Sequence, residues 1–171
     1  MKRLFIILTL ALAALGWEAC VPRYTLNGAS IDYNIYKTIS FGEFPIRAAL
    51  VYPPLQPMLE NRLTDMIAQQ TRLRVVDARN TDLHMEGEIT TYQLSPQAVG
   101  EDAYASQTRL TIGVRVRYTD NKNQALSKDL SFSAYRDFSS TELLTDVQDE
   151  LCNQICKDLS DLIFNATLGD W

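Results

Sequence analysis

The stretch "TRLTIGVRVRY", residues 108–118, carries the clearest structural signal in this chain. Every second residue is large and apolar: Leu110, Ile112, Val114, Val116 and Tyr118. The residues between them are polar, charged or small: Arg109, Thr111, Gly113, Arg115 and Arg117. Side chains alternate between the two faces of a β-strand, so this pattern predicts a strand with one buried and one open face. A sheet with one wet face is typical of antiparallel pairing.

Further strands are predicted on both sides of this stretch. The polar turn "TDNKNQ" (119–124) leads to "KDLSFSAYRDF" (128–138), which we expect to return as a partner strand. Residues 83–95 predict another strand, which we expect Pro96 to end. Shorter strands are predicted in residues 36–44 and 72–77. Gly87 and Gly113 lie inside strand patterns, where a glycine marks a bulge or a close backbone approach.

Two segments have helical periodicity. Residues 55–70 repeat apolar side chains at helical spacing, and Pro54 suits the first turn. For the last helix, Ser139 and Glu142 match a capping box, and Gly169 fits a helix stop. Its expected apolar stripe contains Leu144, Val147, Leu151, Ile155, Leu159, Leu162 and Ile163.

The order of elements defines the expected fold class. One strand, one helix, four strands and a final helix predict an α+β domain. We expect its two helices to pack on one face of a four- to five-stranded mixed or antiparallel sheet. Residues 20–171 form one domain by length, preceded by a signal segment in residues 1–19.

Residues 1–19 have the layout of a secretory signal, with Lys2 and Arg3 at the start and a short apolar run behind them. The run is shorter than the about 20 residues that span a bilayer, so it predicts export without a transmembrane helix. Cys20 follows and has two interpretations: an ordinary exported cysteine, or the acylated first residue of a bacterial lipoprotein. Its position at the end of the signal favours lipidation, and a multiply acylated cysteine would be a firm membrane anchor.

Composition and motifs exclude several functional classes. The net charge is −5 and no basic stripe occurs, which argues against a nucleic-acid binder. Cys152 and Cys156 are four residues apart on the last helix, where Cβ atoms lie about 5–6 Å apart, too far for the about 3.8 Å of a disulfide. We therefore expect two small buried residues. The only histidine, His84, alternates with apolar residues, so we predict a surface strand residue and no metal site.

Catalytic and cofactor-binding motifs are missing from the sequence. It contains no GxSxG elbow, no HExxH helix and no phosphate-binding Walker loop. Glu86 and Glu88 share one strand face, but without a further acid or metal ligand they predict a polar sheet surface. The sequence therefore predicts a protein that is not an enzyme and holds no cofactor.

Several segments together resemble the short form of the LptE family. They are "YTLNGASI" (24–31), "TISFGEFPIRAALVYPPLQPMLENRL" (38–63), "DLHMEGEITTYQLSPQAV" (82–99), "RLTIGVRVRY" (109–118) and the segment from 131 to the terminal Asp-Trp. The resemblance implies two helices packed on one sheet, a lipid anchor at Cys20 and an outer-membrane location facing the periplasm and a barrel lumen. It implies a plug and assembly factor inside the LptD-type barrel that delivers lipopolysaccharide to the cell surface. The alternative is a periplasmic lipoprotein adaptor of another envelope machine.

Arg109, Arg115 and Arg117 share the open face of the central strand and have two interpretations. They could contact the barrel lumen or lipopolysaccharide phosphates, for which arginine supplies bidentate donors. They could instead pair with Glu86 and Glu88 across neighbouring strands, as on an ordinary solvated face. We favour surface pairing, because charge on an open sheet face is common and the whole domain is acidic.

Overall fold

The computed structural model describes residues 31–78, 80–97 and 107–169. Its elements follow the predicted order and are β1 (Thr38–Phe41), α2 (Leu55–Gln70), β2 (Arg74–Val75), β3 (Leu83–Gln97), β4 (Gln107–Asp120), the 3-10 helix η1 (Gln124–Leu126), β5 (Lys128–Ser139) and α3 (Leu144–Thr167). The expected helix over 55–70 has the bounds observed for α2. The first strand is shorter than expected, four residues within the 36–44 segment.

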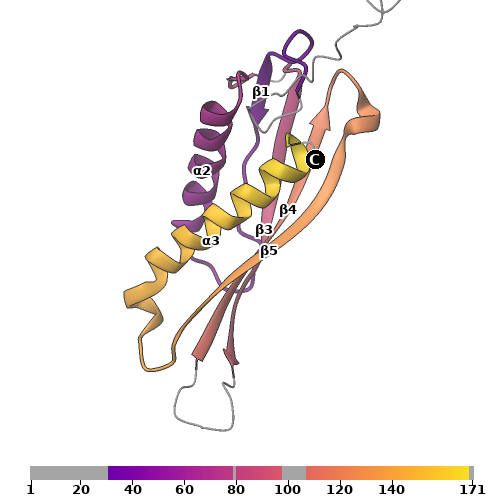
Figure 1. Ribbon diagram of the computed structural model, residues 1–171. Coiled ribbons are helices and arrows are strands. Elements are labelled where there is room, and N and C mark those ends of the chain that lie inside the picture. Colours follow the sequence, from indigo (N-terminus) through magenta and orange to yellow (C-terminus); the bar gives the residue numbers. More distant parts are fainter. Residues whose placement is uncertain (1–30, 79, 98–106, 170–171) are drawn as a thin grey trace, which may run out of the picture.

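The sheet is five-stranded and mixed, in the order β2-β1-β3-β4-β5. β1 runs parallel to both of its neighbours, whereas β3, β4 and β5 form an antiparallel meander. Helices α2 and α3 lie side by side on one face, and no described element covers the other, open face (Figure 1). The predicted α+β class, with two helices on one face of a mixed sheet, is confirmed.

The alternation along β4 sets the two faces. Its apolar residues are all buried against the helices: Leu110, Ile112, Val114, Val116 and Tyr118. Burial of such a side chain contributes about 1.5–3 kcal/mol. On the opposite face, Arg115 and Arg117 are exposed. The side chains of β4 therefore face the core and the open side in the alternation that the sequence predicted.

β3 contains a bulge that the sequence did not reveal. Its register against β4 shifts between Ile89 and Thr91, which reverses the faces of the residues that follow. Odd-numbered Met85 is buried before the bulge, and even-numbered Tyr92 is buried after it. The predicted close approach occurs at Gly87, where a Cβ would lie 2.6 Å from the Phe44 ring.

Two predicted boundaries are wrong. Pro96 does not end β3 but pairs with Thr108 inside it. β1 pairs with β3 only near its start, so no strand in the described part of the chain pairs with the other side of β3 at Pro96, and the missing N–H is tolerated. Ser139 and Glu142 close a separate turn, with the Glu142 N–H donating to the Ser139 carbonyl at 3.0 Å. Helix α3 starts only at Leu144, without a side-chain cap.

Helix α3 buries most of its predicted stripe. Leu151, Ile155, Leu159 and Ile163 are buried, and so are Cys152 and Cys156, as expected for small core residues. Leu162 was expected in this stripe but is 44% exposed. It lies on the side of α3 that faces the outer edge of β5, where none of the described strands covers it. At the other end, the Gly169 N–H donates to the Phe164 carbonyl at 2.9 Å, which fits the predicted stop.

Candidate functional site

The open face of the sheet is the candidate site, and ion pairs cross it from strand to strand. Arg115 on β4 donates to Glu88 on β3 at 2.9 Å. Arg117 lies 3.2 Å from Glu86 on one side and 3.2 Å from Asp129 on the other. These residues are direct partners in the strand register, which explains why the pairs form. The two cross-strand pairs expected with Glu86 and Glu88 are therefore present.

Arg109 is held more firmly than the other two arginines. Its guanidinium makes a bidentate contact with Asp137 on β5, with N–O distances of 2.7 and 2.8 Å. It also stacks over the Tyr135 ring, 3.7 Å from the ring centre. The hydrogen bonds from Arg109 lower the pKa of the Asp137 carboxyl below its usual value. The Arg109 side chain is 30% exposed, so its bidentate ion pair is better shielded from water than the ion pairs of Arg115 and Arg117.

The pairs of Arg115 and Arg117 are weak and exchangeable. The two side chains are 61% and 63% exposed. Exposed ion pairs contribute about 0–1 kcal/mol, because water screens the charges and ordering the side chains costs entropy. A bound anion or a complementary protein surface could replace Glu88 or Glu86 as the partner at little cost. The open face therefore has satisfied charges that remain available for contact.

The β1 end of the open face carries a polar network centred on Ser40. The Ser40 hydroxyl lies 2.8 Å from His84 Nδ1 and 2.8 Å from the Thr81 hydroxyl. His84 is on the open face with a side chain that is 33% exposed, as the sequence predicted. Its ring also lies 3.7 Å from Glu86. These hydrogen bonds join β1 to β3 and to the segment that precedes β3.

Asp82 beside this network is a residue that sequence reasoning missed. Its carboxylate accepts the backbone N–H groups of Lys37 and Thr38 at 2.8 and 3.0 Å and pairs with Lys122 at 3.0 Å. The bond from the Lys37 N–H is the main cause that lowers its pKa to about 2. These bonds fix the start of β1 against β3 and the turn after β4. The partners are 40 or more positions away along the chain, which left no local sequence signal.

The thiols and carboxylates of the described residues do not form a reactive or metal-binding centre. No group of three or more histidine, cysteine or acidic side chains in the described part of the chain could hold a metal ion. Burial raises the pKa of the Cys152 thiol to about 11 and that of Cys156 to about 12. Thiols with such values stay protonated and unreactive near neutral pH. Neither described helix is long and apolar enough to cross a membrane.

Cys20 and residues 1–19 lie outside the described residues, so the expected lipid anchor is not located in the structure. The three arginines are brought together on one face by their shared parity in β4. Contact of these arginines with a barrel or with lipopolysaccharide, the second interpretation, stays a prediction.

These observations define a two-layer α+β domain that presents a polar, ion-paired sheet face. A family model described as lipopolysaccharide-assembly, LptE, matches residues 36–167. The chain belongs to the LptE family. No curated protein sequence matches it.

Solved structures with the same fold come from several bacteria. A minor lipoprotein from Acinetobacter baumannii superposes with a TM-score of 0.50 at 15% identity, covering 75% of this chain and 90% of that chain. A protein of the DUF330 family from Xanthomonas campestris gives a TM-score of 0.54 at 13% identity, covering 78% and 83%. Identities this low show the shared fold and nothing further about function.

Proposed function

We propose that this protein is an outer-membrane lipoprotein that binds inside the LptD-type barrel, helps to assemble it and thereby serves lipopolysaccharide delivery to the cell surface. The observation that carries the proposal is the family match, which spans residues 36–167 and includes both helices and all five strands. The match assigns the chain to lipopolysaccharide assembly. The barrel as its partner is the step that we propose.

The surface of the domain suits such a partner. The lumen of a large outer-membrane barrel is polar and wet, so a protein inside it needs a hydrated, hydrogen-bonding surface. The open face of the sheet supplies one, because arginines and carboxylates alternate across β3, β4 and β5. The apolar residues of β4 are turned toward the helices. The domain can therefore contact the hydrated wall of a barrel lumen while its core stays buried.

The proposal also includes a signal peptide and a lipid anchor near the N-terminus. Residues 1–19 act as a lipoprotein signal peptide, and the acylated Cys20 ties the single domain of residues 20–171 to the outer membrane. Support comes from the basic start, the short apolar run and the position of the cysteine. Two or more acyl chains hold a protein on a membrane stably, whereas one holds it marginally.

Arg109, Arg115 and Arg117 are the proposed contacts with the barrel lumen or with lipopolysaccharide phosphates. Arg115 and Arg117 are the better candidates, since their side chains are more than half exposed and their ion pairs are weak. Arg109 would have to leave a bidentate carboxylate and a tyrosine ring. In a complex it would more readily position Tyr135 and Asp137 than contact a ligand itself.

Affinity purification from envelopes in mild detergent tests the proposal. The tagged full-length protein is expected to bring down a large barrel protein whose sequence identifies it as the LptD-type partner. A tagged unrelated outer-membrane lipoprotein is the control for nonspecific recovery. Recovery of a different envelope complex instead, with no such barrel, would contradict the proposal and support the adaptor alternative.

A further inference from the structure

The outer edge of β5 is an unpaired strand edge. β5 is the last strand of the sheet, twelve residues long, and no described strand pairs with its outer side. It keeps one register with β4 from Lys128 to Ser139. Proteins commonly protect such edges with a proline, a bulge or central lysines. β5 contains no proline and no bulge, and its one lysine is its first residue.

One contact identifies which backbone groups point outward. The Arg136 guanidinium donates to the Tyr135 carbonyl at 2.9 Å, so this carbonyl points away from β4. In an antiparallel strand the N–H and C=O groups of one residue point to the same side, and the side alternates along the strand. The N–H and C=O groups of Ser131 and Ser133 therefore also point to the free edge, whereas those of Phe132 and Ala134 point to β4.

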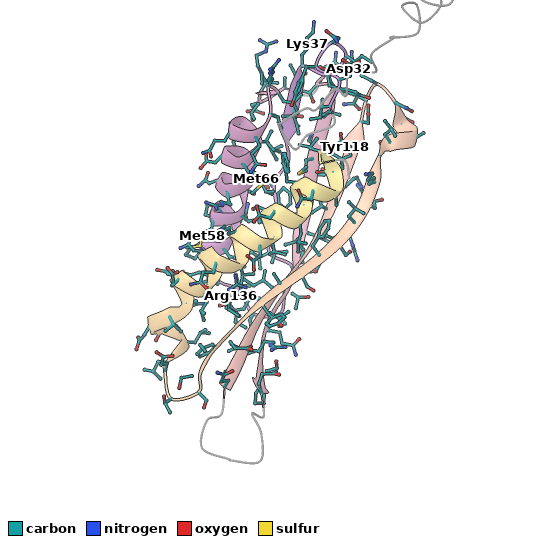
Figure 2. All side chains as sticks on the ribbon, in the orientation of Figure 1. Asp32, Lys37, Met58, Met66, Tyr118 and Arg136 are labelled. Atoms are coloured by element: carbon teal, nitrogen blue, oxygen red, sulfur yellow. The ribbon has the colours of Figure 1, made fainter. Side chains whose placement is uncertain are left out.

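A groove runs along this edge between β5 and α3. Its volume is 680 Å³, and it is lined by residues of both elements. Arg136, which is labelled in Figure 2, lines this groove. Its guanidinium pairs with Asp158 of α3 at 2.7 Å. Asp161 makes no ion pair with any described residue. Leu162, which is 44% exposed, adds an apolar side chain to the same wall.

We propose that the β5 edge accepts an extended segment of the partner barrel polypeptide as a sixth strand. The added strand would lie about 4.8 Å from β5 and take up the outward N–H and C=O groups that Arg136 does not already cover. Its side chains on the helix side would then enter the groove. Charge complementarity assigns a lysine or arginine opposite Asp161, next to an apolar side chain on Leu162. This inference rests on the proposed function, because it names the surface by which the barrel is bound.

Amide hydrogen exchange tests the strand pairing without any substitution. In the free full-length lipoprotein, the outward N–H groups of Ser131 and Ser133 are expected to exchange fast, and the inward ones of Phe132 and Ala134 slowly. In the co-purified complex the outward groups are expected to slow to the rates of the inward ones. The inward groups serve as the internal control.

Two variant pairs test the groove and the edge separately. Asp161→Lys should lower the amount of barrel recovered per lipoprotein about fivefold, since it opposes a basic side chain. Asp65→Lys, the same charge change on an exposed residue of α2, should leave recovery unchanged. Ser133→Pro removes one outward N–H and should also lower recovery, whereas Ser133→Ala keeps that N–H and should not.

The outcomes separate this inference from the proposed function. If the wild type recovers the barrel but the outward amides stay fast and Asp161→Lys has no effect, the edge inference is wrong and the proposed function stands. If no barrel is recovered with the wild type, both are wrong. Protection that appears in the free protein and grows with its concentration would assign the edge to a second copy of this chain, which also overturns the inference.

Discussion

The Phe44 ring lies against the backbone of Gly87, in the space that a side chain at that position would fill. A Cβ at Gly87 would be 2.6 Å from ring atom Cε1 and 2.4 Å from the carbonyl oxygen of Arg115. Phe44 is fully buried. The loop after β1 thus packs on β3 through the Phe44 ring, which needs a residue without a side chain at position 87. Neither the ring nor the Arg115 carbonyl can move without disturbing the core.

Gly87→Ala is therefore expected to destabilise the domain by about 1–3 kcal/mol, the usual cost of overpacking. Gly113→Ala is the matched control on β4. Its Cβ would come 2.9 Å from the Thr91 hydroxyl oxygen and 3.0 Å from the Thr91 Cβ, which are looser contacts than those at Gly87 and involve no backbone atom or buried ring. Urea unfolding of the two variants compares them directly. Equal losses of unfolding free energy would mean that the Phe44 contact does not limit the size of residue 87.

Asp82→Asn is expected to remove a contribution to the free energy of unfolding that the wild type loses in acid. The pKa of Asp82 in the folded protein is about 2, below its ordinary value of 3.8. A depressed carboxyl pKa stabilises the fold above the unfolded value, and that contribution is lost as the pH falls through the folded one. The stability gap between wild type and variant should be constant above pH 3.8 and close toward pH 2.

Denaturant melts of both proteins across this range measure the gap. Asp77→Asn is the control, because it removes an exposed carboxyl from the loop that follows β2. A gap that is the same at all pH values would show that Asp82 acts through its shape and hydrogen bonds rather than through its charge.

Shortening single leucine side chains of α3 to alanine should distinguish the face of the helix that packs on the sheet from the exposed face. Leu159 is fully buried, and Leu159→Ala is expected to cost about 2–5 kcal/mol through lost burial and a cavity. Leu151→Ala should cost a similar amount, toward the lower end because Leu151 is 8% exposed. Leu162→Ala is the control on the same helix and should change the free energy of unfolding by less than about 0.5 kcal/mol. Thermal melts that rank Leu162→Ala with the other two would contradict this docking.

Local patterns in the sequence predicted the fold class because apolar residues recur at a single spacing in most of the long elements. The alternation in β4 and the helical spacing in α2 determine which side chains of these elements face the core. The bulge in β3 escaped prediction since Thr90 and Thr91 suit either face, so the chain shows no sign of the reversal between Ile89 and Tyr92. The position of Leu162 also escaped it. A helical stripe shows which residues are apolar, but not where the sheet beneath the helix ends.

The candidate site was predictable in part for the same reason. Shared parity placed the three arginines on one face, and the register then brought Glu86 and Glu88 opposite two of them. The bidentate contact of Arg109 with Asp137 depends on the pairing of β4 with β5, which parity alone does not give. The bonds of Asp82 to Lys37 depend on parallel pairing of distant segments, which has no local signature.

Cys20→Ser is expected to release the protein from the membrane fraction into the soluble periplasm, since the substitution removes the acceptor of the lipid. Fractionation in high salt and without detergent checks this, and Cys152→Ser, which changes a buried thiol in α3, is the control. Retention through the barrel is excluded by repeating the experiment in cells depleted of the barrel. Membrane association that persists there would contradict the lipid anchor.

The final prediction concerns Arg115 and Arg117. Replacement of both by glutamine removes the two exposed cations without bringing a new negative charge next to Glu86, Glu88 and Asp129. Because the lost ion pairs are exposed, the cost in stability should stay within about 1 kcal/mol for each pair. If the open face contacts the barrel lumen or lipid phosphates, the folded double variant should recover less barrel or bind lipopolysaccharide more weakly.

A second double variant makes the comparison specific. Arg72→Gln with Arg74→Gln removes two exposed cations from the segment of β2, at the opposite edge of the sheet from β5. The net charge is then the same in both variants, so general attraction to anionic lipid changes equally. A loss confined to the Arg115 and Arg117 variant would assign the contact to the open face. Equal binding by both folded variants would leave these two arginines as cross-strand partners of Glu88 and Glu86, as the sequence favours.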